Sequence, residues 1–318
     1  MKAAVLKQLG DIPVYGEIDK PIAQANQVLV KMQAATIKQL DKLKVSGKHY
    51  TTFKQFPTTV GVDGVGILDN GQRIYALGLT GMLAEYALVA ADNYVTVPDN
   101  LSSEIAALLP NALLGSDAAL IYRAQMQQGQ VVLINGATGV SGRMAVQAAK
   151  LRGASYIIAT GRNPESLAYL KQLGADQCVS LLDTEEEICQ QLETLQNTHP
   201  IDHILDYLWG RPTALLLQVL GNNCPKAVNL VTIGQMAGAT IDLASSSLRS
   251  KPISLLGSGF GSISAEQLEN YHKQHLPKMF QLAAEGALVV EYDSHPLAHI
   301  ERAWQAKVAA GSRIVITI

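Results

Sequence analysis

The chain has 318 residues, a length that favours two domains. Hydrophobic residues make up 48% and charged residues 16% of the sequence, which allows a large core and excludes an intrinsically disordered chain. The net charge of -2 provides no basic surface for nucleic acid. The three cysteines are sparse and odd in number, as in proteins of a reducing compartment.

The first residues do not resemble a signal peptide, because the apolar run that follows Met1 is cut at Lys7. The longest apolar stretch, residues 105–122, contains Pro110 and Asp117 and is too interrupted to span a membrane. We therefore expect a soluble, cytoplasmic protein that binds neither membranes nor nucleic acid.

The first third of the chain predicts short β-strands separated by turns. Residues 27–32 alternate in the manner of a half-buried strand, and residues 61–68, 72–76 and 84–89 follow as further strands. Pro57, Gly71 and Gly81 punctuate them. Many short strands at close spacing are typical of an irregular barrel or a sandwich.

The pattern then changes to alternating strands and helices. Residues 103–124 predict helix interrupted near Pro110, and residues 130–135 form an apolar run typical of a strand buried on both faces. Repeated β-α-β units imply a doubly wound parallel sheet, with strands at 156–160, 178–182, 203–207 and 228–233 and helices at 140–152, 164–173, 185–195 and 212–220. A helix at 265–285 and a final strand at 312–318 suggest that the first domain receives the end of the chain.

A glycine-rich turn between the predicted strand 131–135 and the next helix carries the sharpest functional signal. Gly139 would let the backbone approach a pyrophosphate, and Gly142 would let the helix pack against the strand. The helix N-terminus offers N–H groups to phosphates. The alternative is a tight turn without a ligand, and Ala137 replaces the first glycine of the usual fingerprint. The candidate cofactor-binding residues here are Ala137, Thr138, Gly139, Val140, Ser141 and Gly142.

The end of the next predicted strand bears on the choice of nucleotide. An NAD site usually has an acid at this place, whereas this chain has Thr160, Gly161 and Arg162. A guanidinium suits the 2′-phosphate of NADPH, and the Thr160 hydroxyl could add a hydrogen bond. We predict NADPH; the alternative is a surface arginine at a strand end.

These motifs, with the opening Met1–Val5, residues 61–66, 71–76, 82–87 and 97–101, and the closing 311–315, resemble the medium-chain dehydrogenase/reductase superfamily in its quinone oxidoreductase (zeta-crystallin-like) branch. The resemblance implies an α/β protein with a discontinuous GroES-like, β-rich catalytic domain (1–113 and 258–318) and a Rossmann domain (114–257). It also implies that the cofactor lies between the domains and that the protein is a homodimer.

The zinc-dependent members of this superfamily carry Gly-His-Glu where this chain has Gly61, Val62 and Asp63, and a cysteine near residues 37–40. Valine cannot ligate zinc, and the chain has no cysteine before Cys178. Without a Lewis acid, reduction of an electrophile is the expected reaction. The resemblance therefore implies a zinc-independent, NADPH-dependent reductase of a quinone or an α,β-unsaturated carbonyl. The alternatives are an enoyl-thioester or alkenal reductase of the same fold, and a non-catalytic NADPH-binding protein.

Three residues are candidates for catalysis. Lys38 could stabilise an oxyanion, although it could also be a solvated lysine or pair with Asp41 along one helical turn. Asp41 matches the acid of the branch's Asn-Pro-x-Asp/Glu motif, from which Lys38 departs. Tyr50 lies where the family supplies a pocket tyrosine and could donate a proton, or it could be a loop aromatic.

Three later segments match cofactor-contacting positions of the family, the last two at predicted strand ends. The family usually has Thr-Ala where this chain has Gly115 and Ser116, so the resemblance does not imply the usual nicotinamide contacts at these two residues. The candidate residues in these segments are Leu208; Thr232, Ile233 and Gly234; and Gly257, Ser258 and Gly259.

Overall fold

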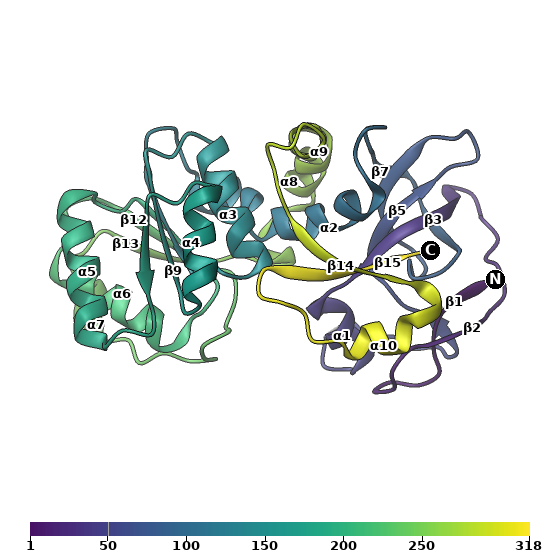
Figure 1. Ribbon diagram of the computed structural model, residues 1–318, viewed down its shortest axis with the longest axis horizontal. Coiled ribbons are helices and arrows are strands. Elements are labelled where there is room, and N and C mark those ends of the chain that lie inside the picture. Colours follow the sequence, from purple (N-terminus) through teal and green to yellow (C-terminus); the bar gives the residue numbers. More distant parts are fainter. Residues whose placement is uncertain (50) are drawn as a thin grey trace. The chain divides into compact units, whose positions relative to one another are not determined.

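A computed structural model describes residues 1–49 and 51–318, the side chain of Phe260 excepted. The chain forms two compact units, one built from residues 1–110 and 269–318 and the other from residues 111–268 (Figure 1). The expected boundaries at 113 and 258 therefore need correction. Residues 258–268 stay with the second unit, where Arg123 donates to the carbonyl oxygens of Gly257 at 2.7 Å and Ser262 at 3.4 Å.

The first unit is the β-rich one. A three-stranded sheet has the order β2-β1-β4, and a six-stranded sheet has the order β14-β15-β3-β5-β6-β7, with β3 also pairing with β7. That extra pairing closes four strands into a barrel, one of the two architectures expected from the sequence. The strands are β1 (Lys2–Leu6), β2 (Val14–Glu17), β3 (Gln27–Ile37), β4 (Thr58–Thr59), β5 (Asp63–Ile67), β6 (Arg73–Gly78), β7 (Tyr86–Thr96), β14 (Glu291–Pro296) and β15 (Ser312–Thr317).

The end of the chain returns to the first unit, as the sequence predicts. β15 pairs antiparallel with β3, with Ile314 opposite Ile37, and parallel with β14 on its other side. Both marked chain ends lie in this unit (Figure 1). Its helices are α1 (Gln39–Val45), η3 (Tyr271–His275), α9 (Leu276–Ala284), η4 (Leu297–His299) and α10 (Ile300–Gln305).

Helix α2 (Ser103–Leu114) contains Pro110 in its interior, so the predicted break at that residue is wrong. Proline has no N–H and so cannot make one of the hydrogen bonds of the helix. Burial of the apolar residues on both sides of Pro110, Ala106 to Leu109 and Ala112 to Leu113, stabilises the helix despite this loss. Residues 103–124 are long and apolar enough to cross a membrane, but 67% of the apolar window is buried within the protein. That burial is typical of a core helix.

The second unit contains a six-stranded sheet of order β10-β9-β8-β11-β12-β13, parallel throughout. This is the doubly wound order. Successive strands are added toward one edge of the sheet from β8 to β10 and toward the other edge from β11 to β13, so the order reverses between the neighbours β8 and β11. The strands are β8 (Val131–Asn135), β9 (Tyr156–Gly161), β10 (Gln177–Ser180), β11 (His203–Asp206), β12 (Val228–Thr232) and β13 (Ile253–Gly257).

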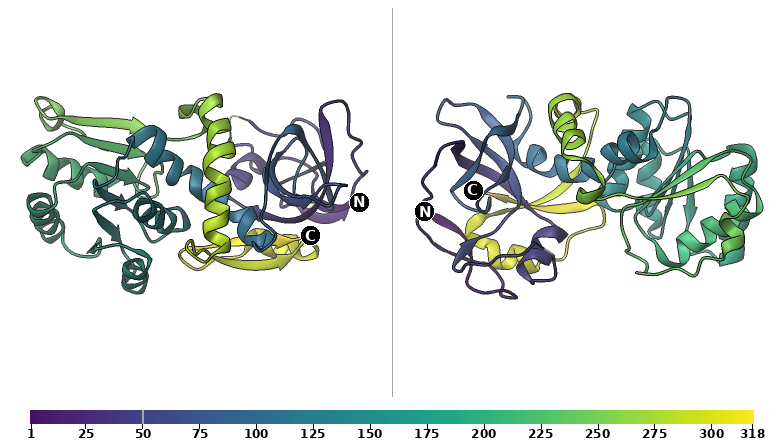
Figure 2. Two further views of the ribbon diagram at one scale, coloured as in Figure 1. Left: turned by 90° about the horizontal axis from the view of Figure 1, so that it is seen from above. Right: turned by 180° about the vertical axis from the view of Figure 1, so that it is seen from behind.

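Side chains alternate between the two faces of this sheet. Val132, Ile134 and Ala159 pack under α3 and α4, whereas Leu133 and Ile158 pack under α5 and α6. Figures 1 and 2 show these helix pairs on opposite sides of the strands. The helices are η1 (Ala119–Ala124), α3 (Val140–Leu151), α4 (Pro164–Leu173), α5 (Glu185–Thr198), α6 (Gly210–Asn222), α7 (Ser245–Leu248), η2 (Phe260–Ser262) and α8 (Ala265–Asn270).

Candidate functional site

The glycine loop joins the carboxyl end of β8 to the start of α3, at the place where the strand order reverses. Gly142 is needed by the fold, because a Cβ there would lie 2.6 Å from the Cα of Ala137. Gly139 is the N-cap of α3 and has an ordinary extended backbone, with φ -81° and ψ 171°. A Cβ on Gly139 would meet nothing within 4 Å among the described residues. Neither strain nor packing therefore explains the glycine at position 139.

The end of β9 abuts this loop. A Cβ on Gly161 would lie 2.4 Å from Cγ2 of Thr138, so Gly161 permits the close approach. Arg162 is exposed and makes no hydrogen bond or ion pair with another described residue. The guanidinium is therefore available to a ligand at this end of the loop.

Thr160 has a different role from the predicted one. Its side chain is 1% exposed, its hydroxyl donates to Oδ1 of Asn135 at 2.7 Å, and it accepts the N–H of Gly136 at 3.0 Å. The hydroxyl supports the glycine loop from beneath, so a hydrogen bond from Thr160 to a phosphate is a prediction that the structure corrects.

A buried polar network continues from Asn135 to Asp206, at the end of the neighbouring strand β11. Nδ2 of Asn135 donates to Oδ1 of Asp206 at 2.8 Å, and the Thr213 hydroxyl donates to Oδ2 at 2.9 Å. The backbone N–H groups of Leu208 and Trp209 donate to the same carboxylate at 3.1 and 3.2 Å. Burial raises the pKa of Asp206, and these hydrogen bonds oppose the shift. The network joins the ends of three adjacent strands.

Two pockets lie along the same edge of the sheet. One, of about 250 Å³, brings together the predicted residues Ser141, Ile233, Ser258 and Gly259; its other lining residues are Asn111, Leu114, Gly115, Ile263 and Leu268. The other, of about 230 Å³, brings together Thr232, Ile233 and Gly234 with Trp209, Gln235 and Ala239. The structure thus gathers residues from several loops that are far apart in the sequence.

Two predicted residues, Leu208 and Gly257, lie beside these pockets. Leu208 covers the glycine loop, since a Cβ on Gly136 would lie 2.7 Å from its side chain. The carbonyl oxygen of Gly257 accepts from Arg123. Trp209 lies in the segment 207–210, which the resemblance matches to cofactor-contacting positions of the family. Asn135 and Asp206 were missed, although each is a polar residue that follows two or more apolar residues at the end of its strand.

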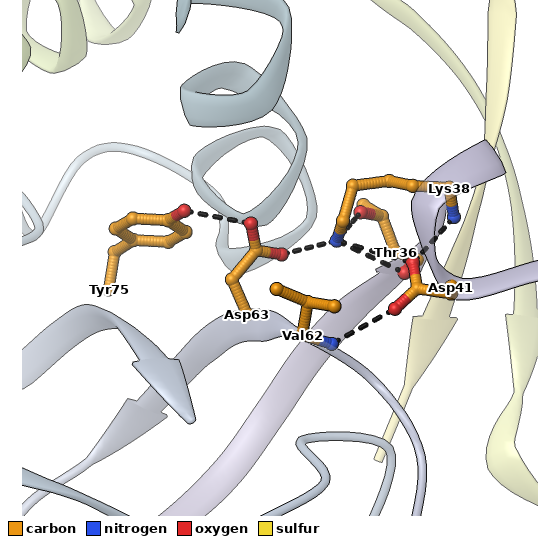
Figure 3. A network of polar contacts seen from close by, with 6 residues as sticks. All are labelled: Thr36, Lys38, Asp41, Val62, Asp63 and Tyr75. Carbon is orange, nitrogen blue, oxygen red and sulfur yellow. Dashed lines mark hydrogen bonds and ion pairs between the residues drawn. The ribbon is translucent and has the colours of Figure 1, made fainter. Parts of the chain in front are cut away.

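The first unit contains a second polar network, shown in Figure 3. The Lys38 ammonium forms an ion pair with Asp63 and donates to Oγ1 of Thr36 at 2.9 Å and to its carbonyl oxygen at 3.4 Å. The Tyr75 hydroxyl donates to the second oxygen of Asp63 at 2.8 Å. Burial raises the pKa of Tyr75 well above its usual value.

Asp41 caps helix α1 and is buried. Its two oxygens accept the backbone N–H groups of Lys38 at 2.8 Å and Val62 at 3.0 Å, and its Oδ2 lies 3.7 Å from the Lys38 ammonium. Burial raises the pKa of this carboxyl, and the charge on Lys38 opposes the shift. Lys38 and Asp41 therefore pair along one helical turn, which was one of the alternatives to a catalytic role for Lys38.

The reading of Lys38 as a solvated lysine is wrong, since its side chain is 2% exposed. Its three ammonium protons have three acceptors within the unit, which leaves none for a substrate oxygen. The direct catalytic roles predicted for Lys38 and Asp41 are thereby corrected to structural ones. Tyr50 lies outside the described residues.

The side chains at this place do not fit a zinc ion. Val62 has no ligand atom, and the Lys38 ammonium already neutralises Asp63. Among residues 1–49 and 51–318, no group of three His, Cys, Asp or Glu side chains could hold a metal ion.

Comparison with known proteins agrees with this architecture. A family model described as zinc-binding dehydrogenase matches residues 141–281. A protein of Bacillus subtilis named "Putative quinone oxidoreductase YhfP" is 32% identical over 235 residues, which are 67% of this chain and 68% of that protein. The chain belongs to the medium-chain dehydrogenase/reductase superfamily.

Within that superfamily the chain belongs to the quinone oxidoreductase branch, which confirms the resemblance and the α/β two-domain fold. The chloroplastic NADPH-dependent alkenal/one oxidoreductase of Arabidopsis thaliana is 32% identical over 59% of this chain, but the match spans only 54% of the plant protein. The quinone oxidoreductase of Thermus thermophilus, solved with and without NADPH, superposes over 100% of both chains with a TM-score of 0.76 and 25% identity.

Proposed function

We propose that the protein is an NADPH-dependent oxidoreductase that reduces a quinone or an α,β-unsaturated carbonyl. Gly139 is the observation that carries the proposal. Neither its backbone conformation nor its surroundings require glycine, so the open space at its Cα favours a ligand over a tight turn without one. The neighbouring N–H groups at the start of α3 suit a pyrophosphate.

The choice of NADPH rests on Arg162, whose exposed guanidinium follows β9 where an acid would favour NADH. Relatives named for NADPH support the same choice. When bound, NADPH supplies the hydride.

The 250 Å³ pocket suits a small, flat acceptor. Leu114, Ile233, Ile263 and Leu268 provide apolar walls, and Ser141 and Ser258 provide a few polar groups. Such walls orient an apolar ring and exclude water during transfer. We extend the proposal to a proton delivered by Tyr50 or water, to a location in the cytoplasm and to a homodimer, on the strength of the family.

The test is Gly139→Ala, whose methyl group would stand where the pyrophosphate is proposed to rest. We expect an unchanged melting temperature and a dissociation constant for NADPH at least about tenfold higher, by fluorescence titration. Gly221→Ala, the same change inside α6, is the matched control because a Cβ there meets only ordinary contacts at 3.6 Å. Unaltered NADPH binding by Gly139→Ala would refute the proposed site.

A panel of quinones, enones and crotonyl thioesters then separates the activities. Consumption of NADPH with quinones or enones supports the proposal. Faster turnover of crotonyl thioesters would assign the protein to enoyl-thioester reduction, and binding of NADPH without turnover of any acceptor would make it a non-catalytic binding protein.

A further inference from the structure

Arg143 is a buried cation on the side of α3 that faces α4. The residue is 9% exposed, and its neighbours Gly142, Met144 and Ala145 on the same helix are buried as well. A charged side chain is almost never buried unless its polar atoms have specific partners. The partners of the Arg143 guanidinium therefore indicate what the residue does.

Two elements hold this guanidinium. Its Nε donates to the carbonyl oxygen of Thr138 in the glycine loop at 3.2 Å. Its Nη2 donates to the Ser166 hydroxyl in α4 at 3.4 Å, and its Cζ lies 5.0 Å from the centre of the Tyr169 ring. Arg143 thus connects the glycine loop to the helix that follows β9.

The contact with Thr138 fixes the orientation of one peptide group. The Thr138–Gly139 peptide is trans, since the cis bond found among the described residues joins Phe56 to Pro57. In a planar trans peptide the C=O and the N–H point in opposite directions. Because the carbonyl oxygen of this peptide faces Arg143, its N–H, which belongs to Gly139, points away from the contact between α3 and α4.

The Gly139 N–H is left for a ligand. The N–H groups of Gly136 and Ala137, earlier in the loop, donate to the hydroxyl and the carbonyl oxygen of Thr160 at 3.0 and 2.8 Å. No described residue accepts the N–H of Gly139 itself. An N–H group without a partner at the start of a helix suits a phosphate oxygen.

We infer that Arg143 is a positioning residue of the cofactor site: its guanidinium holds the Thr138–Gly139 peptide so that the Gly139 N–H faces the pyrophosphate. The inference rests on the proposed function. The side chain of Thr138 lies against Gly161 at the end of β9, so the arginine and the strand hold Thr138 from two sides. An apolar side chain at position 143 could fill the same space, but it could not donate to the carbonyl oxygen.

The experiment compares NADPH and NADH with adenosine 2′-monophosphate, which has the adenosine and the 2′-phosphate but no pyrophosphate. In Arg143→Met we expect the dissociation constants for NADPH and NADH to rise by the same factor, about tenfold, while that for the monophosphate stays within about twofold. Loss of local structure would weaken all three probes, so the ratio of the NADPH constant to the monophosphate constant reports the pyrophosphate contact. An unchanged ratio would overturn the inference. A loss confined to NADPH would also overturn it, because Arg143 would then read the 2′-phosphate.

Arg152→Met is the matched control. Arg152 follows α3 and forms an ion pair with the fully buried carboxylate of Asp117, with Nη2 2.8 Å from Oδ2. Loss of this pair should lower the melting temperature and leave the ratio of the two constants unchanged. An equal change of the ratio in Arg152→Met and Arg143→Met would refute the positioning role. Failure of the wild-type protein to bind any of the three probes would instead refute the proposed function itself.

Discussion

The ammonium of Lys38 and the carboxylate of Asp63 form an ion pair inside the first unit, with side chains 2% and 5% exposed. Thr36 and Tyr75 complete the hydrogen bonds of the two charges (Figure 3). Two charges taken out of water depend on each other, since each alone would be left without compensation. The pair therefore ties α1, through its N-cap residue, to β5.

Replacing Lys38 should destabilise the protein, because Asp63 depends on its charge. Lys38→Met leaves the Asp63 carboxylate buried without a cation, and we expect a loss of about 3–5 kcal/mol in the free energy of unfolding, measured by urea denaturation. Adding Asp63→Asn removes the stranded charge and keeps an acceptor for Tyr75, so the double variant should recover part of the loss.

The exposed pair Lys273–Glu269, with both side chains 62% exposed, provides the comparison for this prediction. Lys273→Met should cost less than about 1 kcal/mol. Equal losses of free energy of unfolding in Lys38→Met and Lys273→Met would contradict the prediction that the buried pair stabilises the fold more than the exposed pair.

Arg162 should decide between the two nucleotides. In Arg162→Ala we expect the dissociation constant for NADPH to rise about 10- to 100-fold, because a charge-assisted hydrogen bond to the 2′-phosphate is lost. Binding of NADH should not change. Arg249→Ala, another exposed arginine of the second unit, is the control. A parallel loss for both nucleotides would show that Arg162 does not read the 2′-phosphate.

His203 should make the second unit sensitive to acid. Its Nε2 lies 2.7 Å from Oε1 of Gln130, which also accepts the Gln127 N–H, so Nε2 carries the proton of the neutral ring. Nδ1 is buried without a hydrogen-bond partner among the described residues. Burial lowers the pKa of His203 below its usual value of 6.5.

Below about pH 6.5 the unfolded chain binds a proton that the folded chain resists, so stability is full above that pH and falls as pH decreases. His203→Gln keeps a donor for Gln130 without a titrating ring. We expect urea midpoints at pH 7.5, 6.0 and 5.0 to fall less in this variant than in the wild type. His299→Gln, at an exposed position, should follow the wild type; identical slopes for all three proteins would refute the prediction.

Gly115 should control the size of the acceptor. A Cβ there would make an ordinary contact of 3.7 Å with Ile233, and its carbonyl oxygen accepts the Tyr207 hydroxyl at 2.6 Å. Gly115→Val should therefore fold normally while filling part of the 250 Å³ pocket. We expect turnover of a naphthoquinone to fall about tenfold more than that of a benzoquinone. Gly115→Ala should show a smaller difference, and equal losses for both quinones would argue against this pocket as the acceptor site.

The sequence predicts the second unit well because its strands are apolar runs bounded by turns. The predicted helix 164–173 matches α4 at both ends, since Asn163 caps it, Pro164 begins it and Gly174 ends it in a left-handed conformation. β14 was missed, because its residues are exposed and its pairing with β15 depends on backbone hydrogen bonds. A strand of this kind has no alternation of apolar and polar side chains from which the sequence could predict it.

The candidate site divides in the same way. The glycine loop and Arg162 follow from local spacing. The role of Lys38 depends on its ion pair with Asp63, which is 25 residues away in the sequence and lies beside Lys38 only because the barrel folds. Asn135 and Asp206 are 71 residues apart, and their contact requires the order and register of parallel strands. Strand ends can be located from the sequence, but which of them become neighbours is decided by the sheet.

The position of β15 between β14 and β3 also sets an order of events during synthesis. Residues 111–268 form one continuous segment and can acquire their sheet as soon as they leave the ribosome. The first 110 residues emerge earlier, yet residues 34–37 of β3 lack one of their partner strands until residues 312–317 have been translated. The part of the protein that is made first is therefore completed last, and its open strand edge must be protected throughout that interval.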